Sequence, residues 1–252
     1  VTNQNAHRYI RQFANEIAIN ELEMIRRQSA DCVAYFYGTD SVLKIPKKER
    51  SREHLLKEAK ILDYLAGQNL PVTLPEVVRI HPEGLYAEHT RLKGTPMSPC
   101  RLESFPSLEQ EAFICAVAEF LSFLHGHIEA DLERALNRVM IIQDRAPQMD
   151  VSHWLEHLQN PPTSYAPAPI THRDFTFEHI YWLGEQQTAF GVIDFGAAAA
   201  HDPFIDFYEL GLPDCILDRI LNQYAGQAEQ IAKKISFQSI LDDIRREYKR
   251  LN

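Results

Sequence analysis

The hydrophobic residues of the chain follow two different periods. Short apolar runs separated by turn residues predict strands in the first part of the chain, at residues 32–37, 41–45, 77–81 and 85–88. Apolar residues spaced three or four positions apart predict helices, the clearest of which span residues 6–27, 53–66 and 108–124. The change of period near residues 88–94 predicts a boundary between a small lobe with a sheet and a larger, mainly helical lobe.

A further pair of extended runs, at residues 180–183 and 188–193, flanks a polar four-residue turn. This pattern is typical of a β-hairpin. Because a hairpin brings its two open ends together, we expect His179 and Asp194 to lie close to each other, with Asp174 on the loop just before them. All three groups can transfer protons or bind a divalent cation. The sequence therefore predicts a chemical site at the open end of this hairpin.

One charged residue interrupts the apolar face of the helix predicted at residues 53–66. Projected at helical spacing, Glu58 falls inside the arc formed by Leu55, Ala59, Leu62 and Leu65. A carboxylate buried without a partner is strongly destabilising. The candidate partner is Lys44, on the strand predicted at 41–45. The alternative is that Glu58 lies at the edge of the apolar arc and reaches water.

Composition and charge narrow the classes of function. The chain has 252 residues, 45% hydrophobic and 24% charged, which suffices for one large domain or two lobes with their own cores. No apolar run reaches the ~18 residues that a membrane span needs, and no signal-peptide pattern opens the sequence. The net charge of −9 argues against nucleic acid or an anionic membrane as the partner and is compatible with a cationic small molecule.

The four cysteines lie far apart, at positions 32, 100, 115 and 215, without a Cys-x-x-Cys pair. This spacing fits neither a zinc site nor a disulfide framework. We therefore expect reduced thiols in a cytoplasmic protein. We also expect a monomer or a weak dimer.

The residues around the predicted hairpin have the chemistry that phosphoryl transfer requires. One carboxylate can orient or deprotonate a hydroxyl, while another holds a metal ion that neutralises phosphate charge. A lysine on a separate small sheet, fixed by a glutamate on a helix, can hold the phosphates. Phosphoryl transfer needs these groups because its catalysis consists mostly of positioning and charge neutralisation.

In their order along the chain, these features resemble the protein-kinase-like fold and, within it, the aminoglycoside phosphotransferase family of antibiotic and small-molecule kinases. The resemblance covers most of the chain. It is carried by Lys44, Glu58, a hinge segment ending in Gly94, Leu124-His125 at a helix end, His172-Arg173-Asp174, Ile193-Asp194-Phe195-Gly196, and Asp202-Pro203 followed by Asp206-Phe207. No Ala-Pro-Glu segment follows Gly196, which argues against a protein kinase.

The resemblance implies an α+β fold with two lobes. A nucleotide-binding lobe with a small antiparallel sheet and one key helix would span residues 1–89, and a hinge would span residues 90–94. A mainly helical lobe that carries the catalytic hairpin and binds the substrate would span residues 95–252. The resemblance also implies that transfer depends on Mg²⁺ and on ATP or GTP as the phosphate donor.

The resemblance assigns a role to each matching residue. Asp174 would be the catalytic base or hydroxyl-orienting carboxylate, Asp194 would bind Mg²⁺, and His172 would support the loop structurally. The nucleotide-binding positions would be Lys44 at the α- and β-phosphates, Glu58, which fixes Lys44, and backbone groups near Glu88, Thr90 and Arg91, which hold the purine.

The sequence departs from the family pattern at three places. His179 stands where the family usually has an asparagine as the second metal ligand. Imidazole is a poorer ligand for a hard cation than an oxygen donor is. His179 is therefore expected either to contact the metal or phosphate directly or to hydrogen-bond a residue that does. The hairpin expected to cover the phosphates, residues 27–38, is nearly devoid of glycine. Arg173 occupies a position where many relatives have glycine.

Two further groups of side chains have alternative interpretations. Five acids and no lysine or arginine lie in residues 202–218. Some of them, with Asp206 and Glu209 as candidates, would bind a cationic substrate, or the whole run would be a solvated face. His125 and His127 have the spacing of a metal pair, but they follow the end of the predicted helix, where the family commonly has a histidine.

Together these expectations describe a phosphotransferase that transfers the γ-phosphate to a hydroxyl of a small, cationic molecule. Aminoglycoside antibiotics are the leading substrate class, and antibiotic resistance is the role that this implies. The alternatives are a macrolide kinase, a metabolic kinase for an amino alcohol or a sugar, and a nucleotide-binding pseudokinase with a regulatory role.

Overall fold

The structure is a computed structural model that describes residues 11, 15, 25–28, 31–126, 170–184, 189–226 and 228–251. Its contacts divide the chain into two compact units. The first comprises Val1–Ala116 and Thr176–Ala198, and the second comprises Val117–Phe175 and Ala199–Asn252. The lobes expected at residues 1–89 and 95–252, with a hinge between them, stay a prediction.

The first unit contains a five-stranded antiparallel sheet in the order β1-β2-β3-β5-β4. Its strands are β1 (Ile25–Gln28), β2 (Cys32–Tyr37), β3 (Ser41–Pro46), β4 (Val77–Ile80) and β5 (Ala87–Thr90). The strands expected from alternating apolar residues are confirmed, with shifts of one or two residues at their ends. Buried hydrophobic side chains, among them Tyr35, Leu43 and Ile45, form a cluster on one face of the sheet.

One element of this sheet corrects a prediction. The helix expected over residues 6–27 lies mostly outside the described residues, but residues 25–27 at its end belong to strand β1 (Ile25–Gln28). Its four residues pair antiparallel with positions 33–36 of β2. Hydrogen bonding to the free edge of β2 decides the conformation here, because tertiary pairing overrides a helical pattern of apolar residues.

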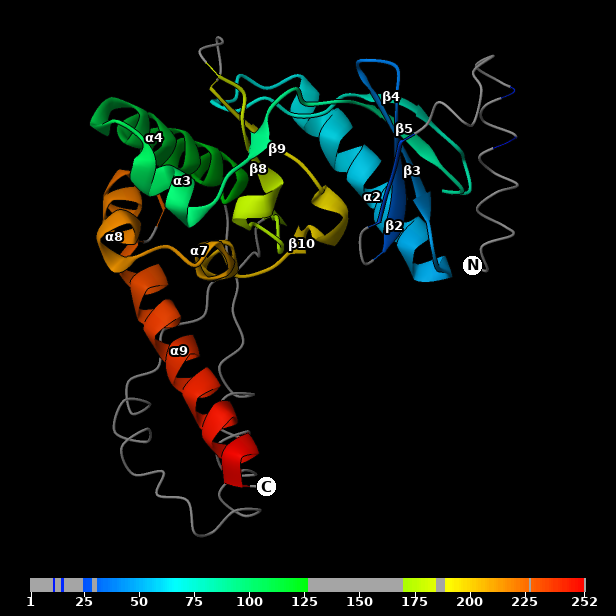
Figure 1. Cartoon of the computed structure of the whole chain (residues 1–252). Helices are drawn as coiled ribbons and strands as arrows, with labels where there is room; N and C mark the ends of the chain where they lie inside the picture. The colour runs from blue at the N-terminus through cyan, green and yellow to red at the C-terminus, as the bar shows by residue number, and fades with distance from the viewer. Residues whose placement is uncertain are drawn as a thin grey trace. The chain divides into compact units, whose positions relative to one another are not determined.

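Helix α2 (Glu49–Ala66) packs against β3 and β4 (Figure 1). The four apolar residues predicted to line its inner face, Leu55, Ala59, Leu62 and Leu65, are all buried. The helix has no glycine or proline in its interior and ends at Gly67, where the chain turns. Its buried face holds it on the sheet, and Glu58 lies on that face.

The predicted central hairpin is confirmed in the first unit. Strands β8 (Ile180–Trp182) and β9 (Phe190–Val192) pair antiparallel, and β6 (Thr95–Pro96) extends them to a three-stranded sheet in the order β6-β8-β9. The short 3₁₀ helices η2 (Phe177–His179) and η3 (Phe195–Ala197) lie at the two open ends. A helical turn therefore positions each candidate ligand, His179 at the end of η2 and Asp194 at the start of η3.

Helices dominate the rest of the described chain. Short α3 (Pro99–Ser104) begins at Ser98, whose side chain accepts a hydrogen bond from the backbone N–H of Arg101. In α4 (Ser107–Leu124), the ring of Phe113 packs edge-on against that of Phe190, at 5.3 Å between centroids. Further along α4, the ring of Phe120 stacks on that of Phe175, at 5.9 Å.

The second unit contains one short strand pair, β7 (Ile170–Thr171) with β10 (Ala199–Ala200). Its helices after β10 are α7 (Phe204–Leu210), α8 (Asp214–Gln223) and α9 (Ala228–Leu251), the long C-terminal helix in Figure 1. Two side-chain contacts hold helix α9 to α7 and to the turn that precedes α7. Lys234 pairs with Asp202, and the hydroxyl of Tyr208 donates to Asp242.

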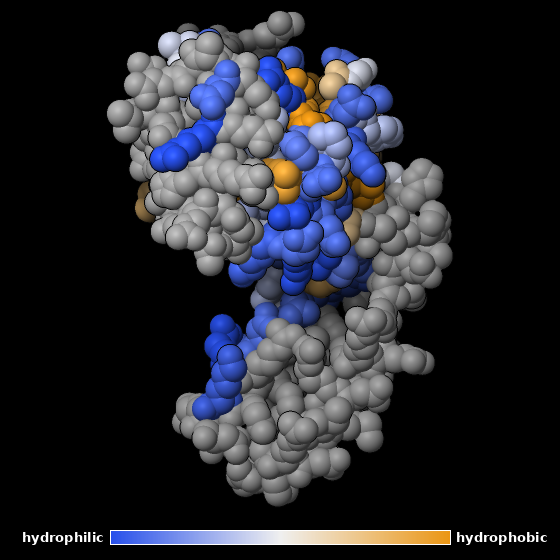
Figure 2. Space-filling model, turned by 90° about the vertical axis from the view of Figure 1, so that its right-hand side faces the viewer, coloured by the Kyte–Doolittle hydropathy of each residue, from blue (hydrophilic) through white to orange (hydrophobic). Residues whose placement is uncertain are grey.

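One face of the molecule shows how polar and apolar residues are distributed on the surface. On the face shown in Figure 2, hydrophilic residues make up most of the coloured surface. No helix in the described part of the chain combines the length and apolarity of a membrane span. The mixed α+β fold with small antiparallel sheets agrees with the fold class expected from the sequence.

The segment that follows β5 can be tested through Gly94. A Cβ atom at this position would collide with the backbone carbonyl oxygen of Trp182 and lie 2.8 Å from the Cδ2 atom of Leu183. Gly94→Ala should therefore reduce the free energy of unfolding by about 2 kcal/mol, because a backbone oxygen cannot move aside cheaply. Urea denaturation measures this change. Gly67→Ala is the matched control, since nothing lies within 4 Å of a Cβ there, and equal effects of the two substitutions would contradict the prediction.

Candidate functional site

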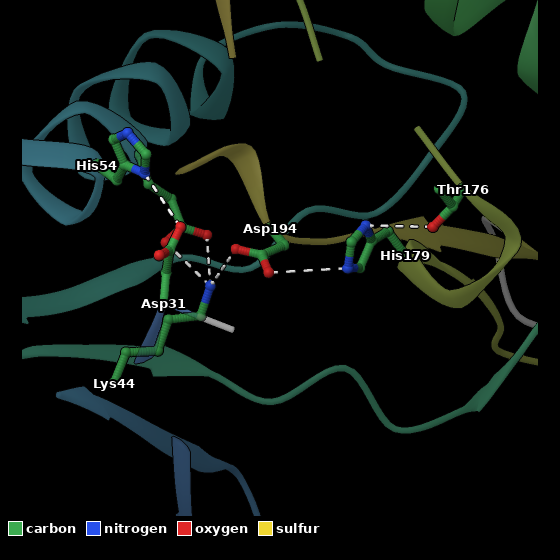
Figure 3. A network of polar contacts seen from close by, with 7 residues as sticks. Asp31, Lys44, His54, Thr176, His179 and Asp194 are labelled. Atoms are coloured by element: carbon green, nitrogen blue, oxygen red, sulfur yellow. Dashed lines mark hydrogen bonds and ion pairs between the residues drawn. The ribbon is translucent and has the colours of Figure 1, made fainter. Parts of the chain in front are cut away.

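The first unit brings together a lysine and two carboxylates from three separate elements. The Nζ atom of Lys44 in β3 lies 2.7 Å from Oε1 and 2.9 Å from Oε2 of Glu58 in α2. The same atom lies 3.0 Å from Oδ1 of Asp194, at the end of the hairpin (Figure 3). Glu58 is 2% exposed, so the predicted pairing with Lys44 is confirmed and the alternative, a carboxylate reaching water, is wrong.

The electrostatics of this cluster keep the lysine charged. Burial lowers the pKa of the Lys44 ammonium, but Glu58 and Asp194 outweigh this effect and raise the pKa above its ordinary value. The backbone N–H of Phe195 also donates a hydrogen bond to Glu58. The buried carboxylate thus fixes both the lysine and the backbone that follows Asp194.

The open end of the hairpin brings His179 to Asp194, as predicted. Nε2 of His179 lies 3.7 Å from Oδ2 of Asp194, and the other ring nitrogen lies 3.4 Å from the hydroxyl of Thr176 (Figure 3). The backbone N–H of Ile193 donates a hydrogen bond to the carbonyl of His179 at 3.0 Å, which holds the two open ends of the hairpin together. Asp174 belongs to the second unit, so its convergence with these two side chains stays a prediction.

Asp194 has an unusual backbone conformation. Its φ of 69° lies in the left-handed region, which side chains other than glycine rarely adopt. Such residues are costly and cluster at functional sites, where surrounding contacts hold them in place. Here the contacts with Lys44 and His179 are made in this conformation.

The two predicted nucleotide-binding residues on β5, Glu88 and Thr90, lie on the same face of the sheet. Glu88 is the cross-strand partner of Leu43, so its side chain lies on the face opposite Lys44. There its carboxylate accepts a hydrogen bond from the hydroxyl of Tyr37. The backbone N–H groups of Thr90 and Arg91 donate to the carbonyls of Glu76 and Asp40, at 2.9 and 2.7 Å. The role of these three residues in holding a purine stays a prediction.

Sequence reasoning missed a histidine on the same strand. His89 is the cross-strand partner of Val42, two residues before Lys44, so its imidazole lies on the Lys44 face. The residue is only 3% exposed. Burial, with a further contribution from the Lys44 ammonium, lowers the pKa of His89 to about 3. The signal was present in the alternation of β5, where Glu88 and Thr90 share one face and His89 takes the other.

The second unit builds the loop that carries Asp174 around Asp206. One oxygen of the Asp206 carboxylate accepts a hydrogen bond from the backbone N–H of His172 at 2.8 Å, and the other accepts from that of Arg173 at 2.7 Å. Asp206 is completely buried. The expectation that Asp206 binds substrate is therefore corrected, because the carboxylate is out of reach and holds the loop instead.

Two histidines support this loop. Nε2 of His125, at the end of α4, lies 2.9 Å from Oδ2 of Asp206, and its Nδ1 lies 3.2 Å from the hydroxyl of Tyr224. Both ring nitrogens are thus engaged within the fold, which argues against a metal-binding role for His125. His127 lies outside the described residues. His172 is completely buried against the ring of Phe175, in agreement with a structural role.

Glu209, the other predicted substrate ligand, lies close to Asp174 at the end of α7. Burial, together with the charges of Asp206 and Asp174, raises the pKa of Glu209 to about 7. The backbone N–H of Phe175 donates a hydrogen bond to the Glu209 carboxylate. Its Oε2 atom has no hydrogen-bond partner among the described residues. A carboxyl with this pKa changes its charge near neutral pH, so the environment of Asp174 is pH-sensitive.

Comparison with known proteins identifies the family. The sequence model of the phosphotransferase enzyme family (APH) matches residues 27–230 of the 252-residue chain. The chain belongs to this family. No curated protein matches the sequence significantly.

Solved structures of this fold agree with the assignment. Wild-type aminoglycoside 2'-phosphotransferase-IIIa in complex with GDP is 20% identical, with a TM-score of 0.74 over 100% of this chain and 92% of that one. A complex of an APH(2'') enzyme with streptomycin and ATP is 19% identical, with a TM-score of 0.69 over 99% and 92%. Macrolide 2'-phosphotransferase type I is 20% identical, with a TM-score of 0.63 over 98% and 95%. At these identities the likeness shows the fold.

The residues of this phosphotransferase fit a magnesium ion that binds together with nucleotide. Mg²⁺ is commonly held by one or two carboxylates plus substrate phosphates and water. Asp194 offers such a carboxylate, 35% exposed, beside an imidazole. No group of three or more histidine, cysteine or acidic side chains in the described residues could hold a metal alone. A magnesium site at Asp194 stays a prediction, and nucleotide phosphates would have to complete its ligands.

The role of Asp206 in this phosphotransferase can be tested by Asp206→Asn. Burial raises the pKa of Asp206, but the hydrogen bonds from His125 and from the His172 backbone outweigh it and lower the pKa below its ordinary value of 3.8. The ionised carboxylate therefore stabilises the fold above that value, and this contribution is lost as the pH falls through the folded-state pKa. The substitution should reduce the free energy of unfolding at pH 7 by about 3 kcal/mol.

Urea denaturation from pH 7 down to about pH 2 measures this effect, because the loss continues below pH 3.8. The loss of stability in acid should be smaller in Asp206→Asn than in the natural protein, because the substituted residue does not titrate. Asp218→Asn, at an exposed position of α8, is the matched control. An unchanged acid limb in Asp206→Asn would contradict the assignment of this carboxylate as the anchor of the loop.

Proposed function

We propose that this protein is a nucleotide- and Mg²⁺-dependent kinase that transfers the γ-phosphate of ATP or GTP to a hydroxyl of a small molecule. The observation that carries the proposal is the contact of Lys44 with both Glu58 and Asp194. An ammonium fixed at a helix carboxylate, next to a partly exposed carboxylate, provides a charged site for phosphates and their metal ion. Membership of the phosphotransferase family supports the same conclusion.

Each residue then has a definite task. Lys44 binds the α- and β-phosphates, and Glu58 holds it in place. Asp194 would hold Mg²⁺, which neutralises phosphate charge when bound. His179, beside Asp194, contacts the metal-bound phosphates or orients the Asp194 carboxylate. Asp174 accepts or orients the proton of the acceptor hydroxyl, and Asp206 keeps the loop around Asp174 in shape.

Aminoglycosides are the proposed acceptor class. The proposal is supported by the acidic chain and by Glu209 close to Asp174, because polycationic sugars favour a site with carboxylates. The similar structures include complexes with kanamycin, streptomycin and gentamicin. The similar structures also include macrolide phosphotransferases, so a macrolide is the alternative acceptor. A metabolic amino alcohol or sugar is a further alternative.

A nucleotide-binding pseudokinase is the competing function from another class. It is favoured by one observation, the imidazole of His179 beside Asp194, since imidazole is a weak ligand for Mg²⁺. A pseudokinase would bind nucleotide without transferring phosphate. Both functions therefore predict nucleotide binding, and only the kinase predicts nucleotide turnover.

A coupled nucleotide-turnover assay with Mg²⁺ tests the proposal. ATP and GTP are each combined with a panel of aminoglycosides, macrolides and amino alcohols, and we expect acceptor-dependent turnover. Asp174→Ala should lower kcat by at least about a hundredfold, because the base or hydroxyl-orienting group is lost. Nucleotide binding, followed by the rise in melting temperature, should remain in this variant.

Glu178→Ala is the matched control for Asp174→Ala, because Glu178 is an exposed acid four residues away. It should leave turnover unchanged. Silence across the panel, with nucleotide still raising the melting temperature, would favour the pseudokinase. Silence without any effect of nucleotide would contradict the proposed function altogether.

The raised pKa of Glu209 predicts how the binding of a cationic acceptor depends on pH. Its carboxyl, with a pKa of about 7, is mostly protonated below that pH and ionised above it. The KM for kanamycin should therefore fall as the pH rises from 6 to 8, and Glu209→Gln should abolish this dependence. Steady-state kinetics at fixed saturating nucleotide measure it. Asp214→Asn, an exposed acid on α8, should retain the dependence, and a pH-dependent KM in Glu209→Gln would exclude this role.

A further inference from the structure

Asp31 joins the turn between β1 and β2 to the start of helix α2. Its backbone carbonyl accepts a hydrogen bond from the backbone N–H of Lys47 at 2.9 Å, just before α2 begins. Its Oδ1 accepts from the hydroxyl of Ser51 at 3.4 Å, and its Oδ2 lies 3.4 Å from Nδ1 of His54. Figure 3 shows the carboxylate and the imidazole facing each other. Main chain and side chain of Asp31 are thus both held by the segment that begins α2.

The same side of α2 holds the proposed phosphate site. His54 precedes Glu58 by four residues, so the two side chains lie one above the other on the helix. Glu58 binds the ammonium of Lys44. A Cβ atom on Gly196 would lie 3.7 Å from Cβ of His54, so η3 also packs against this part of the helix. One stretch of α2 therefore contacts the turn of the β1–β2 hairpin, the phosphate-binding lysine and η3.

The turn that Asp31 anchors lies next to the Lys44 cluster. Cys32 follows Asp31 and begins β2 on the face of the sheet that carries Lys44, because Ala34 is the cross-strand partner of Lys44. Burial raises the pKa of the Cys32 thiol to about 12, and the charges of Lys44 and of both carboxylates that bind it also act on the thiol. The end of the turn therefore borders the site proposed for the nucleotide phosphates.

The composition of this hairpin gives the anchor a purpose. A backbone that adapts closely to phosphates usually relies on glycine, and residues 25–37 contain none. A turn without glycine adapts to a ligand only at a conformational cost, so its position before the nucleotide arrives matters more. Holding a segment in its binding position strengthens binding, because less conformational entropy is lost when the ligand binds.

We propose that Asp31 and His54 are positioning residues that hold the turn of the β1–β2 hairpin in place for nucleotide binding. The inference rests on the proposed function and deepens it, because it adds two residues outside the Lys44 cluster to the same site. The opposite role for Asp31, whose side chain is 51% exposed, is a charge that repels the phosphates. The two roles differ in sign, since an anchor strengthens nucleotide binding and a repelling charge weakens it.

Nucleotide affinities of single and double variants test the inference. ATP and GTP, each with Mg²⁺, are titrated by calorimetry. Asp31→Ala and His54→Leu should each raise the Kd about fivefold, the effect of one partly exposed polar contact. The double variant should bind no more weakly than Asp31→Ala, because both substitutions remove the same contact. His54→Gln should keep the natural affinity, because its amide can donate to the Asp31 carboxylate. The kcat of all four variants should equal that of the natural protein.

Glu49→Gln is the matched control, because it removes the ion pair of Glu49 with Arg52 near the start of the same helix. It should leave the Kd unchanged. Tighter binding by Asp31→Ala would show that the carboxylate repels the phosphates and would overturn the inference.

Unchanged affinity, or additive effects of Asp31→Ala and His54→Leu, would overturn it as well. In all these cases nucleotide still binds, so the proposed function stands. The comparison of His54→Leu with His54→Gln decides the question even if Asp31→Ala does not fold. If the natural protein binds neither nucleotide, the proposed function fails, and the inference fails with it.

Discussion

The structure depends above all on the need to compensate one carboxylate that is taken out of water. Glu58 faces inward on α2, where an unpaired negative charge would destabilise the fold strongly. Both of its oxygens bind the ammonium of Lys44, and the backbone N–H of Phe195 adds a hydrogen bond. Glu58 and these two partners come from a helix, a strand and a hairpin end that lie far apart in the sequence. Satisfying one buried charge thus brings the proposed phosphate-binding groups into a single arrangement.

The same constraint organises the second unit around Asp206. This completely buried carboxylate gathers the backbone N–H groups of His172 and Arg173 and the imidazole of His125. Arg173 pays for this arrangement with a left-handed backbone, φ 60°, which costs about 1–3 kcal/mol for a residue other than glycine. The strain persists because its release would leave a buried carboxylate unsatisfied. The residue after Arg173 is Asp174, so a completely buried charge shapes the loop that carries the proposed base.

Periodicity predicts what depends on a single element, and it fails where contacts between elements decide. The place of Glu58 inside the apolar arc of α2 could be predicted, because helical spacing alone determines which residues share a face. The burial of Asp206 could not be predicted, because the sequence does not distinguish it from the other acids in residues 202–218. Only the contact of α7 with the loop at His172 and Arg173 does so. Ile25–Gln28 became a strand because β2 offered an edge. The alternation of β5 separates His89 from Glu88 and Thr90, but only the register between β3 and β5 puts His89 on the face of Lys44, and no local pattern fixes that register.

Charge balance supports the proposal that a nucleotide binds to this site together with a cation. In the cluster of the first unit a single ammonium, that of Lys44, faces two carboxylates. Lys44, Glu58 and Asp194 together therefore carry an excess of negative charge. A bare triphosphate would add more negative charge next to Asp194, and the repulsion between like charges would oppose its binding. A divalent cation between them removes this repulsion for both partners. By the reciprocity of linked binding, the proposed metal ion and the proposed nucleotide would each strengthen the binding of the other at a site with this charge.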